Sequence, residues 1–223
     1  MGRDRQWREQ AVTVPVGDGS VVLDGAWQAG ERDDAAVIAA AHPLYGGTLD
    51  HPVCHELSYA FYRRGTPSLR FGWRGTGASS GGRSGDLDVA EADLRAALDH
   101  VALTVTGPIA LAGYSFGAIA ALWTAISLGR GDLAPTDGAQ HRHRIRRIVC
   151  VAPPARMLAE LSLADVEAPI ACVVGSDDTL APVTELRALL ERAPGSLLEV
   201  VPGADHFFGV DIGDLSSALD RCV

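Results

Sequence analysis

The residue with the clearest chemical potential is a serine, Ser115, which stands between two glycines in the segment 113–117, GYSFG. An apolar run at 108–112 precedes this segment, and a helix-like stretch at 118–128 follows it. A sharp turn from a buried strand into a helix strains the serine backbone and leaves no room for side chains on either side, a condition that glycine meets. The hydroxyl of Ser115 would then project from the edge of a sheet beside helix amides, as a nucleophile does.

A serine hydroxyl is a weak nucleophile near neutral pH and needs a base, which a carboxylate in turn orients. On a parallel sheet such groups gather where strands end, in the chain order serine, acid, histidine. His206 follows the serine directly after a predicted strand, whereas the other histidines precede the serine or belong to a basic loop. The loop before it offers two adjacent aspartates, Asp177 and Asp178, of which only one is expected to reach the imidazole.

Each of these signals has a plainer alternative. The GYSFG pattern can arise by chance in a chain rich in glycine and serine, and the segment 175–178 has the composition of an ordinary turn. The loop 72–85 lacks the lysine and the glycine spacing of a phosphate-binding loop. Its Arg74 either binds a substrate anion or holds a neighbouring loop, and we favour the second role.

The elements that must position these residues alternate between strand and helix. Two short strands, 12–16 and 21–27, flank a glycine turn and predict an antiparallel hairpin at the start of the sheet. Further strands are expected at 35–41, 66–71, 108–112, 145–152, 170–174 and 197–201. Helices are expected between them and at the end, at 52–64, 88–101, 118–128, 183–192 and 215–222. The inward face of the helix 88–101 is expected at Val89, Ala92, Ala96 and Ala97. This order predicts an α/β fold in one domain, 1–223, with a mostly parallel sheet and helices on both faces.

Composition and charge argue against several classes of function. The formal net charge of −9 disfavours a nucleic-acid surface, and the basic cluster 141–147 is interpreted as a solvated loop. A membrane span needs about 18 consecutive apolar residues, which this chain lacks, and its charged start is unlike a signal peptide. The four cysteines have no metal-ligand spacing. We therefore expect a soluble, cytoplasmic protein with no metal and no nucleic-acid or membrane partner.

Four loops together resemble those of the α/β-hydrolase superfamily, in particular its small bacterial members without a cap domain. These loops are 42–48, 69–79, 175–182 and 203–208. The resemblance implies an α/β-hydrolase fold with an antiparallel start to the sheet and no sizeable cap. In such proteins the acid stands three residues after the glycine and four before the proline, which selects Asp178 over Asp177. The implied catalytic triad is Ser115, Asp178 and His206.

An oxyanion hole is expected from two backbone amides. One belongs to Phe116, the residue after the serine, and the other to the loop 42–48. Pro43 has no N–H and cannot donate. Position within the family favours Leu44, with Tyr45 as the second choice. The other interpretation of this loop is a tight turn without a catalytic role.

These residues predict cleavage of a small-molecule carboxylic ester or thioester through an acyl-enzyme, without a cofactor. The connection 153–169 is too short for a cap, so the pocket should be open and suited to a small or medium apolar acyl group. Its expected lining is Leu44, Tyr45, Trp73, Phe116, Met157, Leu158 and Phe207. Other classes stay open: acyl transfer to an alcohol, cyclisation, a lyase or isomerase reaction, and ligand binding without catalysis.

Overall fold

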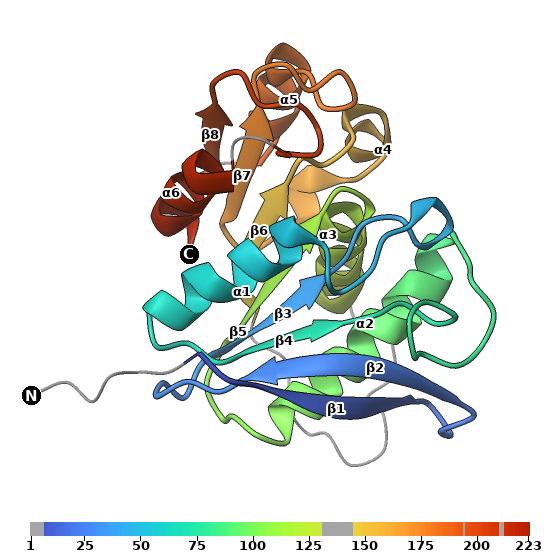
Figure 1. The fold of residues 1–223 in the computed structure, drawn as a ribbon. Coiled ribbons are helices and arrows are strands. Elements are labelled where there is room, and N and C mark those ends of the chain that lie inside the picture. Colours follow the sequence, from blue (N-terminus) through green and yellow to red (C-terminus); the bar gives the residue numbers. More distant parts are fainter. Residues whose placement is uncertain (1–6, 131–144, 194, 210–211) are drawn as a thin grey trace, which may run out of the picture.

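An eight-stranded sheet runs through the computed structural model, which describes residues 7–130, 145–193, 195–209 and 212–223 (Figure 1). The strands lie in the order β1-β2-β4-β3-β5-β6-β7-β8. Their bounds are β1 Glu9–Val16, β2 Val21–Gln28, β3 Ala35–Ala39, β4 Ser68–Phe71, β5 Ile109–Tyr114, β6 Ile145–Val151, β7 Ile170–Gly175 and β8 Leu197–Val201. The strand that leads to Ser115, β5, therefore lies in the interior of the sheet.

The pairing of the strands confirms the predicted fold class. The first two strands pair antiparallel through a tight turn in which Gly17 and Gly19 have positive φ angles of 56° and 83°. β2 also pairs antiparallel with β4, and all pairings from β4 through β3 to β8 are parallel. Parallel strands bring their carboxyl ends to one edge of the sheet, which is where such folds carry their sites.

Helices cover both faces of the sheet. In Figure 1, α1 and α6 lie together in front of the sheet, while α2 and α3 pack against each other behind it. The helices are α1 Pro52–Arg63, α2 Leu87–Ala102, α3 Phe116–Arg130, α4 Ala155–Ala159, α5 Val183–Leu190 and α6 Ile212–Cys222, with short 3₁₀ helices η1 Pro43–Tyr45 and η2 Leu163–Asp165. Over the described ranges, none of these helices has the length and apolar character needed to cross a membrane.

The core lies on both sides of the middle strands. Every residue of β3, β5 and β7 is buried, as expected for continuous apolar runs in a sheet that helices cover on both faces. Removing apolar surface from water stabilises the fold by about 25 cal/mol per Å². The loops at the carboxyl edge are therefore attached to well-packed strands.

The inward face of α2 differs from the prediction. Ala92 is exposed and Val89 is only half-buried, whereas the carboxylate of Asp93 is almost fully enclosed. Asp93 is tolerated there because the guanidinium of Arg74 donates to it at 2.7 and 2.9 Å. Arg74 therefore fixes its own loop to α2; its role is structural, but its partner is a helix and not the neighbouring loop that we expected. Helical periodicity could not reveal a charge that is compensated by a residue from another loop.

The predicted insertion, 129–144, falls almost entirely outside the described residues, as does the first part of the basic cluster 141–147. Two arginines of that cluster are described. Arg146 pairs with Asp34 at 3.2 Å, and Arg147 donates to the carbonyl of Cys222 at 2.7 Å. These guanidinium groups are engaged within the protein.

Candidate functional site

Ser115 occupies a strained turn between β5 and α3. Its φ angle is +55°, a conformation that non-glycine residues rarely adopt, and its amide donates to the carbonyl of Val151 at 2.8 Å. A Cβ added to Gly113 would overlap the backbone of Gly117, and one added to Gly117 would overlap the carbonyl of Ala39. Close backbone contacts therefore require glycine at both positions, as the sequence pattern around Ser115 predicted.

His206 lies between Ser115 and Asp178. Its Nε2 is 3.0 Å from Ser115 Oγ, and its Nδ1 is 2.7 Å from Asp178 Oδ2. The carboxylate can only accept at Nδ1, so we assign the imidazole proton to Nδ1 and leave Nε2 to accept from the serine hydroxyl. All three side chains are buried, with exposures of 9% or less. The structure thus brings together Ser115 and His206 with Asp178, the aspartate that the family resemblance implied.

The two adjacent aspartates point in different directions. Asp178 Oδ1 accepts from the amides of Leu180 and Ala181, each at 2.9 Å, so one oxygen anchors the carboxylate while the other faces His206. Asp177 is exposed and accepts from the hydroxyl of Ser176 at 2.8 Å. Of the two, only Asp178 reaches the imidazole.

The loop that carries His206 is held by a residue that sequence reasoning did not single out. The hydroxyl of Tyr114 donates to the backbone carbonyl of His206 at 3.1 Å, and its ring lies 5.8 Å from the imidazole, centroid to centroid. Burial is the main reason why the pKa of the Tyr114 hydroxyl is raised, so it stays a donor. Asp205 adds a turn by accepting from the amides of Phe207 and Phe208. A tyrosine in the GYSFG segment carries no sequence signal for this contact.

The two predicted oxyanion amides differ in what they do in this structure. The Phe116 amide lies in the first turn of α3 and has no hydrogen-bond acceptor within the described part of the chain. The Leu44 amide donates instead to Nδ1 of His42 at 3.2 Å, and the Tyr45 amide donates to the His42 carbonyl at 3.0 Å. The bond to Nδ1 is at the long end of the usual range, so a developing negative charge would compete for the Leu44 amide.

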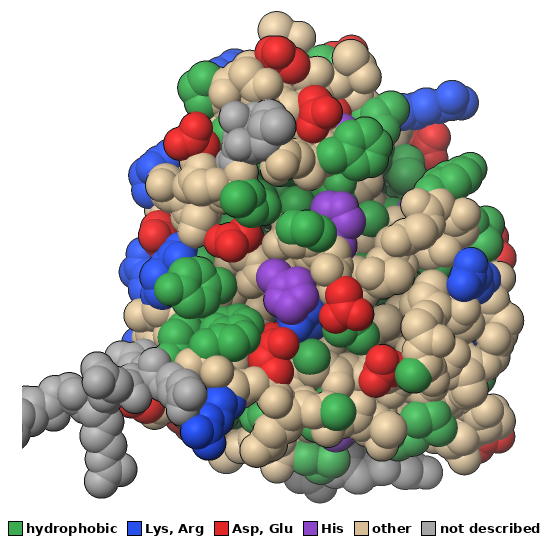
Figure 2. All heavy atoms as spheres, in the orientation of Figure 1, with side chains coloured by type: hydrophobic (Ala, Val, Ile, Leu, Met, Phe, Trp, Pro, Cys, Tyr) green, Lys and Arg blue, Asp and Glu red, His purple; other side chains and the backbone are tan. Residues whose placement is uncertain are grey.

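The predicted pocket lining divides into exposed and enclosed residues. Leu44, Tyr45 and Phe207 are exposed by 53%, 86% and 62%, and Met157 is half-buried. Figure 2 shows histidine side chains near the middle of the front face, bordered by hydrophobic side chains. Exposed Leu180, in the loop of the aspartates, is a further apolar residue that the sequence did not indicate.

Three of the predicted lining residues are corrected by the structure. The side chains of Trp73, Phe116 and Leu158 are enclosed, each residue being only 1% exposed, and offer no surface to a substrate. The indole N–H of Trp73 donates to the carbonyls of Ala40 and Ala41, both at 3.0 Å, so this side chain fixes the end of β3. An apolar residue in a loop near a site can serve the core as readily as the rim.

The chain resembles proteins of known structure over nearly its whole length. No family model matches it. An uncharacterized protein of Rickettsia prowazekii is 27% identical over 199 residues, which cover 83% of this chain and 76% of that protein.

Two solved structures give the likeness more detail. An α/β serine hydrolase homologue from Coxiella burnetii is 25% identical, with a TM-score of 0.79 and 99% of each chain covered. XC6422 from Xanthomonas campestris, described as an α/β serine hydrolase without a lid, is 25% identical with a TM-score of 0.79, covering 97% of this chain and 94% of that one. The order of the strands, the strained turn at Ser115 and the likeness to these two structures all point to the same superfamily. The chain belongs to the α/β-hydrolase superfamily, among its small members without a cap domain.

Proposed function

We propose that the protein is a serine hydrolase that cleaves a carboxylic ester or thioester through an acyl-enzyme. The observation that carries this proposal is the continuous chain of hydrogen bonds from Asp178 through His206 to Ser115. This chain ends at a hydroxyl on a turn whose strain serves to present it. Likeness to serine hydrolases of similar size supports the same reaction class.

In the proposed reaction, Ser115 Oγ attacks the substrate carbonyl carbon while its proton moves to His206 Nε2. The imidazolium then returns that proton to the leaving oxygen or sulfur as the acyl–leaving group bond breaks. Water attacks the acyl-enzyme with His206 again as the base, which releases the acid and restores the serine. Asp178 holds the tautomer and stabilises the imidazolium in both halves.

The negative charge on the carbonyl oxygen needs donors that already point at it. The Phe116 amide is available in the first turn of α3, where the helix dipole adds to its effect. We assign the second donor to Leu44, whose amide would exchange its long bond to His42 for a shorter one to the oxyanion. Exposed Leu44, Tyr45 and Phe207 favour a substrate with a small or medium apolar acyl group.

The test uses Ser115→Ala against the control Ser217→Ala, whose hydroxyl donates to a carbonyl within α6. Wild type and the control should hydrolyse p-nitrophenyl butyrate and react with a fluorophosphonate probe. Ser115→Ala should lose labelling and at least about a thousandfold in kcat, because the nucleophile is gone. A Ser115→Ala protein that still hydrolyses the ester at a comparable rate would exclude this mechanism. Labelling of the wild type without hydrolysis, but with acyl transfer to added alcohol, would indicate a transferase.

A further inference from the structure

A second histidine, His51, lies next to the proposed triad in a fixed orientation. It precedes the first turn of α1, and its Nδ1 accepts from the Val53 amide at 3.2 Å. This bond makes Nδ1 an acceptor, so the proton of the neutral ring stands on Nε2. The His51 ring therefore presents an N–H donor on the side away from the helix.

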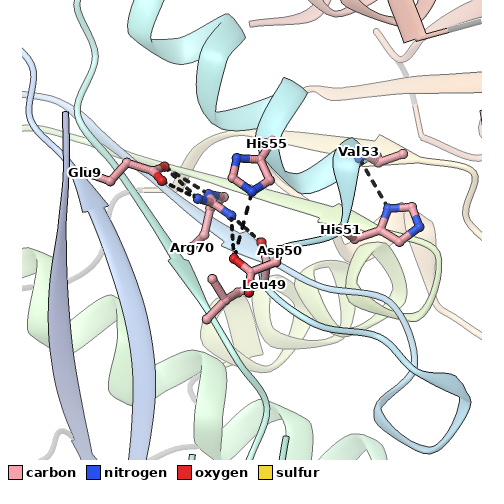
Figure 3. A network of polar contacts seen from close by, with 7 residues as sticks. All are labelled: Glu9, Leu49, Asp50, His51, Val53, His55 and Arg70. Atoms are coloured by element: carbon pink, nitrogen blue, oxygen red, sulfur yellow. Dashed lines mark hydrogen bonds and ion pairs between the residues drawn. The ribbon is translucent and has the colours of Figure 1, made fainter. Parts of the chain in front are cut away.

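The loop before His51 is clamped from behind by a buried arginine, Arg70 on β4 (Figure 3). Arg70 is 1% exposed; it binds the Glu9 carboxylate at 2.6 and 2.7 Å and donates to the carbonyl of Leu49. Figure 3 shows the His51 ring pointing away from this network. An arginine held by a carboxylate and a carbonyl fixes the backbone two residues before His51, so the ring starts from a rigid base.

The His51 ring lies against Tyr114, the residue before the proposed nucleophile. The His51 and Tyr114 ring centroids are 4.6 Å apart with an interplanar angle of 32°, and the Tyr114 and His206 centroids are 5.8 Å apart with an angle of 34°. A single aromatic ring thus touches both imidazoles. His51 is half-buried, and burial, followed by the charge of His206, lowers its pKa, so the ring is neutral at pH 7.

The Nε2–H of His51 has no hydrogen-bond partner within the described ranges. A donor held this rigidly and left free beside a reactive centre suits a group that arrives with the substrate. In the proposed reaction, His206 hands its proton to the leaving oxygen, so the leaving group lies on the His206 side of the site. His51 packs against the same Tyr114 ring as His206 and so lies beside this part of the site.

We propose that the Nε2–H of His51 binds a hydrogen-bond acceptor, such as an ether or hydroxyl oxygen, on the alcohol part of an ester substrate. This inference rests on the proposed function and deepens it by naming a preference for the leaving group. A hydrogen bond at a partly exposed site should raise kcat/KM for a matching substrate by about three- to tenfold over an analogue that lacks the acceptor.

The experiment compares esters that differ by one atom. Butyrate esters of 2-methoxyethanol and n-butanol form one pair. Those of 3-methoxypropanol and n-pentanol form a second pair, in which the ether oxygen lies one carbon further from the ester group. Hydrolysis is measured by pH-stat titration of the released butyric acid, and the readout is the ratio of kcat/KM within each pair. Because both esters meet the same protein preparation, this ratio does not depend on how much of a variant is folded.

Two variants remove the donor in different ways. His51→Asn keeps a side-chain oxygen that can cap α1 at Val53, and His51→Phe keeps a ring against Tyr114. The matched control is His55→Asn, one helical turn further along, where the imidazole lies 3.9 Å from Asp50. Wild type and His55→Asn should prefer the ether ester in at least one pair by about three- to tenfold, and both His51 variants should bring that ratio to about one.

The outcomes separate this inference from the function on which it rests. Hydrolysis of both esters with a ratio of one in wild type, or an unchanged ratio in the two His51 variants, overturns the role of His51 and leaves the hydrolase proposal intact. Absence of hydrolysis together with absence of fluorophosphonate labelling overturns the hydrolase proposal, and the role of His51 falls with it.

Discussion

At the scale of single residues, the candidate site depends on backbone groups as much as on side chains. Two amides fix one oxygen of Asp178, and the Tyr114 hydroxyl fixes the carbonyl of His206. Ser115 is held in a left-handed conformation that costs about 1–3 kcal/mol. The cost is offset by packing elsewhere, and its effect is to hold the hydroxyl at 3.0 Å from the imidazole without substrate.

The role of Asp178 can be tested by a substitution of almost equal shape. In Asp178→Asn, an amide oxygen can still accept from Leu180 and Ala181, so the fold should stay intact. The amide nitrogen would then face Nδ1 and favour the tautomer with the proton on Nε2, which cannot accept from Ser115. We expect kcat for p-nitrophenyl butyrate to fall about a thousand- to ten-thousandfold with little change in melting temperature.

The neighbouring aspartate supplies the control for this substitution. Asp177→Asn changes an exposed side chain that accepts from Ser176, so its kcat should match that of the wild type. Equal losses in the two variants would mean that the loop as a whole, and not the carboxylate on His206, supports the activity.

At the scale of elements, the turn from β5 into α3 depends on a close approach to β3. Gly117 in the first turn of α3 lies against the carbonyls of Ala39 and Ala40, with no room for a Cβ. In an open helix, alanine in place of glycine would stabilise by about 1 kcal/mol. Here the overlap with backbone outweighs that gain, because neither β3 nor α3 can move without disturbing the core.

Gly117→Ala should therefore lower the free energy of unfolding by about 3 kcal/mol, measured by urea denaturation. Gly82→Ala is the matched control, because a Cβ at Gly82 meets open space and the φ angle there is not positive. The control should stay within about 0.5 kcal/mol of the wild type. Equal stability of the two variants would show that α3 can shift away from β3 at no cost.

At the scale of the whole molecule, the sheet and its order of elements were predictable because local patterns carry them. Uninterrupted apolar runs predicted β3, β5 and β7, and the spacing of turns predicted the alternation with helices. Strand and helix ends differ by a few residues, as at β5, which extends to Tyr114. Loop motifs selected Ser115 and His206 because chemistry restricts which residue types can follow which strands.

What the sequence did not reveal are contacts between segments far apart in the chain. Arg70 is buried within a strand because Glu9 compensates its charge, and nothing around either residue in the sequence indicates the other. The same holds for His51 against Tyr114. Trp73 was predicted to line the pocket, yet its indole N–H bonds to carbonyls at the end of β3. Composition identifies an apolar side chain but does not tell which surface it covers.

The position of β8 in the sheet has a consequence for how the protein would lose activity. In the part of the chain that the structure describes, β8 pairs only with β7, and four of its five residues are exposed or half-buried. Edge strands with little buried surface open at lower free energy than interior ones. Fraying of β8 would carry away the loop of His206, whereas Ser115, attached to interior β5, would stay in place.

Partial denaturation should therefore separate inactivation from unfolding. We expect ester hydrolysis to disappear at a lower urea concentration than the far-UV circular dichroism signal, and to return when the urea is diluted. Coincident midpoints would mean that β8 opens only with the rest of the sheet. Ser115 would then keep its native position at urea concentrations at which His206 has already been displaced.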